Sequence, residues 1–136
     1  IATMLGGRAA EELSFDDVTT GASDDLDKAT KLAREMVTQY GMSSLGLVSY
    51  GAKSMFGIWK NPFDTEEKYS QEIMSKIDAE VKKIVDDCFA LAKKVLGEHK
   101  EKLDTLATKL LEVETLDGDE YRALLGLPSP VVANGK

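Results

Sequence analysis

The feature that most constrains this fold is a long, regular stripe of apolar residues in the second half of the chain. Its members recur at spacings of three and four residues: Tyr69, Ile73, Ile77, Val81, Ile84, Cys88, Ala92 and Val95. Such spacing places side chains on one face of an α-helix, and flanking apolar residues make this face wider than a coiled-coil seam. The stripe therefore predicts one long helix that begins with a capping-box pattern at Asp64 and Glu67 and ends near Gly97.

Shorter helical patterns surround this long helix. They cover residues 1–13, residues 23–40 before Gly41, a leucine-rich segment at 103–111, and a last segment from Asp117 to Gly126 that opens on a capping pattern with Glu120. We therefore expect a mainly α fold, a helical bundle of about five helices with at most a short strand or hairpin in residues 42–64.

The composition is typical of a single acidic globular domain. The chain has 136 residues and a net charge of −7 with both signs intermixed, which argues against nucleic-acid binding. No apolar run approaches the roughly 18 residues of a membrane span. We expect residues 1–126 to form one soluble domain and residues 127–136 a flexible tail. Cys88 lies in register with the apolar stripe, which favours a buried structural thiol over a nucleophile.

Residues 42–64 interrupt the helical pattern with glycines and a proline. Residues 47–50 are compatible with one short strand. An aromatic-rich cluster follows, made of Met55, Phe56, Ile58, Trp59 and Phe63. Two roles stay open for this cluster: packing against the helices, or a contact surface for a substrate or a neighbouring subunit.

Two adjacent carboxylates open the helix predicted for residues 23–40. At helical spacing Asp24 lies on a polar face with Lys28, whereas Asp25 lies on the apolar face with Ala29. We expect Asp25 to point inward, where a charge needs a hydrogen bond, a counter-charge or a metal. The alternative is that Ser23 is the N-cap and both aspartates only complement the helix dipole.

Several segments, in a fixed order, resemble a known family. They are residues 6–12 (GGRAAEE), 19–26 (TTGASDDL), 29–34 (ATKLAR), 36–43 (MVTQYGMS) and 114–116 (ETL). Together they resemble the C-terminal half of the peptidase domain of FtsH-type proteases, which are ATP-dependent, membrane-anchored zinc enzymes. The resemblance extends from about residue 1 to about residue 126.

The resemblance implies specific roles. In that family two histidines of an H-E-x-x-H helix and one aspartate bind zinc, and the glutamate of that motif is the general base. By position Asp25 is the implied metal ligand, and Glu11 is implied to orient a ligand near the zinc. The intact protein is implied to use zinc and, in an ATPase module, ATP with Mg²⁺. It is further implied to cleave protein substrates as a hexamer in a bacterial inner, mitochondrial inner or thylakoid membrane.

The sequence also departs from the family pattern. Asp24 stands where the family usually has Asn, and no H-E-x-x-H is present. The single histidine, His99, lies beside Gly97 at a predicted helix end, where a solvated role is expected. Because a catalytic zinc takes three protein ligands, we expect no catalytic residue in this chain, a general base upstream of Ile1, and a piece that is inactive and free of cofactor by itself.

Alternatives to these assignments remain open at the level of sequence. Glu11 is also explained by an ion pair with Arg8 on the surface of a helix. The chain as a whole is also compatible with a catalytically dead FtsH-like subunit, or with a helical interaction module whose motifs match by chance.

Overall fold

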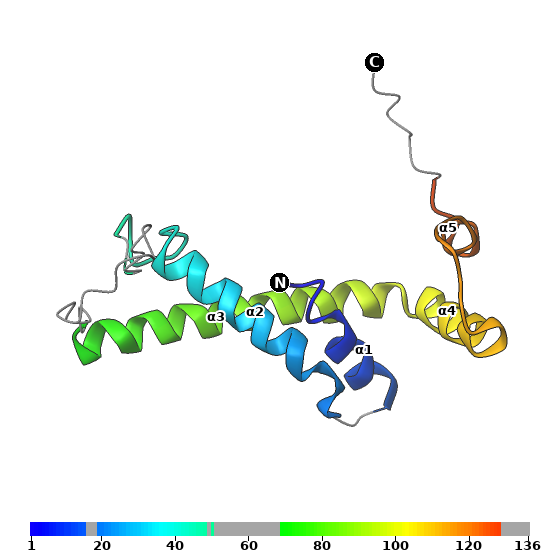
Figure 1. The fold of residues 1–136 in the computed structure, drawn as a ribbon, viewed down its shortest axis with the longest axis horizontal. Helices are drawn as coiled ribbons and strands as arrows, with labels where there is room; N and C mark the ends of the chain where they lie inside the picture. The colour runs from blue at the N-terminus through cyan, green and yellow to red at the C-terminus, as the bar shows by residue number, and fades with distance from the viewer. Residues whose placement is uncertain (16–18, 49, 51–68, 129–136) are drawn as a thin grey trace, which may run out of the picture. The chain divides into compact units, whose positions relative to one another are not determined.

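The computed structural model describes residues 1–15, 19–48, 50 and 69–128. Within these residues the chain forms five α-helices and one 3₁₀ turn and contains no strand, which confirms the mainly α prediction (Figure 1). The chain divides into two compact units, Ile1–Lys94 and Val95–Lys136. None of the helices in the described residues has the length and apolarity that a membrane crossing requires.

The first unit contains α1 (Gly6–Phe15), the 3₁₀ turn η1 (Thr20–Ala22), α2 (Ser23–Thr38) and most of α3 (Gln71–Glu98). Helix α2 crosses α3 obliquely (Figure 1). The core of the first unit is a cluster of four buried residues from these two helices: Ala33, Val37, Ile77 and Val81. Partly buried apolar residues pack around that cluster: Ile1, Leu45, Tyr50, Ile73, Ile84 and Val85.

Helix α3 confirms the long apolar stripe. Ile77, Val81 and Ala92 are buried along one face, and the helix ends at Glu98, next to Gly97. Its start differs from the prediction, because Tyr69 and Ser70 precede the helix and the Ser70 hydroxyl accepts a hydrogen bond from the Ile73 N–H at 3.3 Å. A serine at this position satisfies an otherwise unpaired amide. The expected capping residues 64 and 67 lie outside the described residues, and Cys88 is half-buried.

One helix start and one helix cap also differ from the prediction. Helix α1 begins at Gly6 and not at Ile1, because residues 1–5 form turns in which the Leu5 N–H donates to the Ile1 carbonyl at 3.1 Å. Ser23 is not an N-cap. Its backbone is already helical, because η1 continues directly into α2, and the capping side chain is Thr19.

Helix α2 ends at Thr38, two residues before the predicted end, and the predicted glycine stop follows at Gly41. Gly41 adopts a left-handed backbone with a φ of 62°, a conformation that glycine tolerates without strain. Residues 42–48 then form turns, so the short strand expected at 47–50 is not present in the described residues. The aromatic-rich cluster at 55–63 lies outside the described residues.

The second unit contains α4 (Lys100–Val113) and α5 (Gly118–Leu125). Helix α5 begins with the predicted capping box, in which Asp117 accepts bonds from the Asp119 and Glu120 amides and Glu120 accepts one from the Asp117 amide. Gly126 ends it with a φ of 65°. His99 is exposed at the N-cap of α4. Beyond Pro128 the predicted tail lies outside the described residues.

Candidate functional site

The two carboxylates singled out by the sequence lie on different helices of the first unit. Glu11 is on α1 and Asp25 is in the first turn of α2. The chain between them passes through η1, whose Thr19 cap contacts Glu11 directly. Residues 16–18 of this connection lie outside the described residues.

Glu11 is half-buried, and its two carboxylate oxygens have different surroundings. The Thr19 hydroxyl donates to Oε1 at 2.7 Å. Oε2 is inaccessible to solvent and has no hydrogen-bond partner in the described part of the chain. A buried acceptor without a donor destabilises the protein, and natural structures contain few of them. Oε2 is therefore a position at which an N–H or O–H donor would be stabilising.

The sequence offered an ion pair with Arg8 as an explanation of Glu11, but the neighbouring residue Glu12 makes that pair. Arg8 pairs with Glu12 at 3.2 Å, and Lys93 of α3 pairs with the same carboxylate at 3.1 Å. The hydrogen bond from Lys93, helped by both positive charges, lowers the pKa of Glu12 below its ordinary value. Glu12 thus links α1 to α3, and Glu11 is left with Thr19 as its partner within the described residues.

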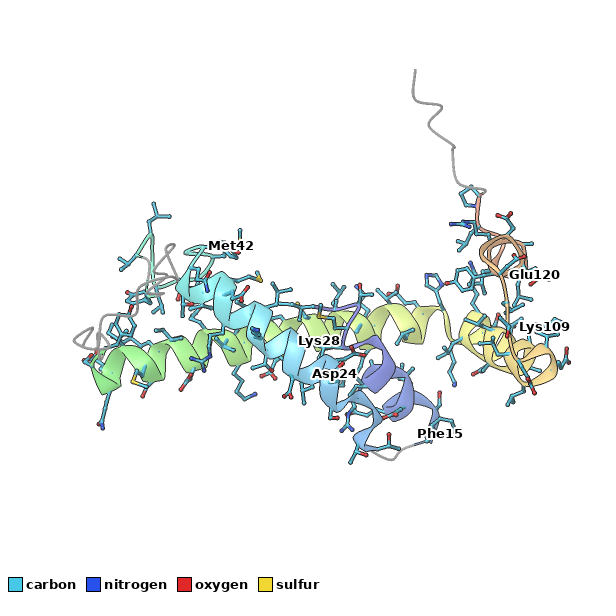
Figure 2. All side chains as sticks on the ribbon, viewed as in Figure 1. Phe15, Asp24, Lys28, Met42, Lys109 and Glu120 are labelled. Carbon is cyan, nitrogen blue, oxygen red and sulfur yellow. The ribbon has the colours of Figure 1, made fainter. Side chains whose placement is uncertain are left out.

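Asp24 behaves as predicted for a residue on the polar face. Its carboxylate pairs with Lys28 one turn later at 2.6 Å, and both side chains are more than half exposed (Figure 2). The hydrogen bond that Lys28 donates to the Asp24 carboxylate is the main cause that raises the pKa of Lys28, and the charge of Asp25 contributes less. Asp24 is therefore occupied by a surface ion pair.

Asp25 is exposed, which corrects the expectation that it points into the core. Ala29, which was predicted to share its face, is buried, and Ala33 and Val37 continue the buried row at intervals of four residues. The row becomes buried only from Ala29 onward, because no described residue covers the first turn. Asp25 makes no side-chain hydrogen bond or ion pair with the described residues, so its carboxylate is available to a ligand.

An apolar groove of about 450 Å³ adjoins this segment. Met4, Leu5, Leu26, Val85 and Phe89 supply its apolar lining, while Thr19 and Ser23 border it from η1 and α2. Arg8, Glu12 and Asp86 also line the groove, so it is mainly apolar but contains charged side chains of both signs.

The described residues do not bring together three histidine, cysteine, aspartate or glutamate side chains that could hold a metal. A catalytic zinc needs three protein ligands and one open position. Of the residues expected at the metal, Asp25 offers one free carboxylate, and Glu11 offers an acceptor that could orient a second ligand. The donor set therefore fits zinc in part.

Sequence reasoning missed Thr19. The Ser23 hydroxyl was the more obvious cap, yet Thr19 accepts from the Gly21 amide at 3.2 Å while donating to Glu11. A threonine two residues before a glycine is a recognisable turn signal. Its contact with Glu11, eight residues earlier, has no such signal in the sequence.

Comparison with known proteins identifies close similarities. The family model of peptidase family M41 matches residues 1–124. The chain is 44% identical to the ATP-dependent zinc metalloprotease FtsH of Thermotoga maritima over 126 residues, which are 92% of this chain and 21% of that protein. It is 47% identical to the protein of the same name from Acholeplasma laidlawii, over 90% of this chain and 20% of the relative. The FtsH of Bacillus subtilis is 41% identical over 92% of the chain and 20% of its own length.

Proposed function

The chain belongs to peptidase family M41, and from this membership we propose that it is part of an ATP-dependent zinc metalloendopeptidase. The chain spans about a fifth of the length of the curated relatives that it matches, so this activity is proposed for a larger protein. A match across residues 1–124 also removes the alternative that the motifs arose by chance.

The observation that carries the proposal is the contrast between the two adjacent aspartates. Asp24 is paired with Lys28 at 2.6 Å, whereas Asp25 has no such partner in the described residues and lies at the position that the family resemblance implies for a ligand. We assign Asp25 the role of the carboxylate ligand of zinc. Glu11 is assigned the role of accepting an N–H from another ligand through its free Oε2.

A bound zinc ion supplies a Lewis acid that activates water for hydrolysis of a peptide bond. The residues of this chain position that ion and do not themselves exchange protons with the substrate. The two histidine ligands and the glutamate general base are assigned to an H-E-x-x-H motif outside these 136 residues.

The broader setting is also proposed from the family resemblance. We assign the intact protein an ATPase module that uses ATP and Mg²⁺, a hexameric ring, and a membrane anchor in a bacterial inner, mitochondrial inner or thylakoid membrane. Its substrates are assigned as unfolded or membrane proteins, in a role in protein quality control. The words "ATP-dependent" and "zinc metalloprotease" in the names of the relatives support the nucleotide and the metal.

The decisive experiment compares Asp25→Asn with Asp24→Asn in the intact protein. Asp25→Asn should abolish proteolysis and zinc retention, because a neutral amide is a poor zinc ligand. Asp24→Asn removes only an exposed ion pair and should leave both nearly unchanged. Casein hydrolysis and metal content after dialysis are the measurements. Equal losses in the two variants would contradict the assignment, and an intact protein without any proteolysis or zinc would favour a catalytically dead subunit.

A second measurement uses the 136-residue chain by itself. Because Asp25 is its one assigned ligand, the chain should hold no stoichiometric zinc after dialysis and should not hydrolyse casein. One tightly bound zinc per chain would overturn the proposed division of ligands between this chain and the rest of the protein.

A further inference from the structure

We propose that Thr19 is a positioning residue that holds Glu11 in the orientation its assigned role requires and connects it to the helix that carries Asp25. This inference rests on the proposed function. It goes further in assigning a role to a residue that lies in the family-like segment 19–26 but to which the resemblance gives no role.

The direction of each hydrogen bond at Thr19 is determined by chemistry. An ionised carboxylate only accepts, and a backbone N–H only donates. The single hydroxyl proton of Thr19 must therefore point to Glu11 Oε1, at 2.7 Å. The Gly21 amide donates to the hydroxyl oxygen of Thr19, Oγ1, at 3.2 Å. Thr19 thus completes a chain of two hydrogen bonds from the η1 backbone to the carboxylate.

These two hydrogen bonds determine which oxygen of Glu11 remains available to a donor. Because Oε1 is held by Thr19, the carboxylate cannot rotate freely, and Oε2 stays in its buried position without a donor. A charge-assisted hydrogen bond at that oxygen is stronger than a neutral one. An imidazole N–H of a metal-binding histidine is the donor for which the fixed orientation is suited.

The same hydroxyl also determines where α2 begins. Thr19 is the N-cap of η1, and η1 runs into α2 without a break, so the cap fixes the start of the segment that carries Asp25. Gly21 allows this close arrangement. A Cβ at that position would lie 3.3 Å from Thr19 Oγ1 and 3.7 Å from Glu11 Oε1. One side chain therefore connects the two carboxylates assigned to the metal centre.

The test separates positioning from simple capping in the intact protein. Thr19→Ser keeps both the donor and the acceptor and should retain zinc as the parent protein does. Thr19→Val removes both. Thr19→Asp keeps a good capping acceptor but cannot donate to Glu11 and places a second negative charge beside it. We expect Thr19→Val and Thr19→Asp to weaken zinc binding by about 10- to 100-fold, the usual effect of losing a partner of a ligand.

Two readouts accompany zinc affinity. Amide exchange at Gly21 should be fast in Thr19→Val but protected in Thr19→Ser and Thr19→Asp, which reports capping alone. In a double-mutant cycle, Thr19→Val should add less loss to Glu11→Ala than it causes by itself, because the alanine has already removed the contact and only the loss of the cap is left. Thr20→Val is the matched control, since the Thr20 hydroxyl makes no hydrogen bond in the described residues, and it should change zinc affinity by less than about twofold.

The outcomes distinguish this inference from the function on which it rests. If Asp25→Asn loses zinc while Thr19→Val and Thr19→Asp retain it, the positioning role is wrong and the ligand assignment stands. If Thr19→Asp binds zinc like Thr19→Ser, Thr19 is only a cap. Additive losses in the cycle would likewise overturn the inference. If Asp25→Asn retains zinc, the proposed metal centre itself is wrong.

Discussion

The two units of the chain are built from similar amphipathic helices but differ in what stabilises them. All buried apolar residues of the described chain lie in Ile1–Lys94: Leu5, Ala9, Ala29, Ala33, Val37, Ile77, Val81 and Ala92. Helices α4 and α5 of Val95–Lys136 contain no buried residue, and Leu111 is 86% exposed. The second unit has instead the most complete helix cap, at Asp117.

This difference shows that burial of apolar side chains and helix capping contribute unequally to stability. Burying a large aliphatic side chain contributes about 1.5–3 kcal/mol, whereas a helix cap contributes about 1 kcal/mol. Helices of 14 and 8 residues, such as α4 and α5, are also close to the length at which isolated helices are marginal in water. We therefore expect the second unit to open locally more often than the first.

The largest test of this comparison removes a core side chain. Ile77 is 3% exposed in the α2–α3 cluster, and Ile77→Ala should lower the free energy of unfolding by about 2–5 kcal/mol through lost burial and a cavity. Leu111→Ala is the matched change in the second unit and should cost no more than about 0.5 kcal/mol. Urea denaturation followed by circular dichroism measures both. Similar costs would show that the two units are stabilised in the same way.

The next test compares a left-handed glycine from each unit. Gly126→Ala meets no atom within 4 Å and should cost only the backbone strain, about 1 kcal/mol. Gly41→Ala has the same strain, and its Cβ would also lie 3.4 Å from the Gly46 carbonyl oxygen, so its cost should be larger. Unfolding free energies decide the order. A larger cost at Gly126 would mean that the second unit is packed more tightly than its exposure indicates.

A third test concerns capping. Asp117→Ala removes both side-chain bonds to the first amides of α5 and should destabilise the second unit by about 1 kcal/mol. Ser23→Ala should have almost no effect, because Ser23 lies inside the helical segment and Thr19 makes the cap. Hydrogen exchange of the α5 and α2 amides reports the two changes. Faster exchange in α2 of Ser23→Ala would contradict the observed helix start.

The smallest expected effect is a dependence of the first unit on pH. The Ser44 hydroxyl and amide donate to Glu80 and lower the pKa of its carboxyl below the ordinary value of 4.5. This contribution is therefore present above about pH 4.5 and is lost as pH falls through the lowered pKa of the folded state. The melting temperature of Glu80→Gln should fall less on acidification than that of the parent chain. Ser44→Ala should reproduce part of this flattening, and an unchanged profile in both variants would exclude the contact as a source of acid sensitivity.

Periodic features of the fold were predictable from the sequence, whereas helix starts and contacts between helices were not. The α3 stripe and the Asp117 capping box are encoded over a few neighbouring residues, and the structure confirms both. The start of α2 at Ser23 was predicted, but its cap was misassigned, because Ser23 and Thr19 are both good caps and the backbone of η1 decides between them. The Glu12–Lys93 pair joins residues 81 positions apart, a separation at which no local pattern operates.

In the candidate site, too, local spacing was predictable from the sequence and contacts between elements were not. The row that contains Asp25 was predictable from helical spacing, but its exposure was not, because burial depends on what covers the first turn. The Thr19–Glu11 hydrogen bond joins α1 to the cap of η1 and was equally out of reach. Spacing identifies which residues share a face, and only the tertiary structure identifies what that face meets.

The small residues on α2 have a consequence for the geometry of the proposed metal site. Ala29, Ala33 and Val37 are fully buried on the row that begins with Asp25, and the row changes from alanine to valine at its far end. If α2 slipped by four residues toward its N-terminus, Val37 would enter the space that Ala33 fills, and Asp25 would move by about 6 Å. Metal–ligand distances tolerate deviations of only about 0.2 Å from their usual values. The larger volume of Val37 therefore opposes such a slip, and we expect a larger side chain at Ala33 to shift the helix that carries the proposed ligand Asp25, although the two residues lie two turns apart.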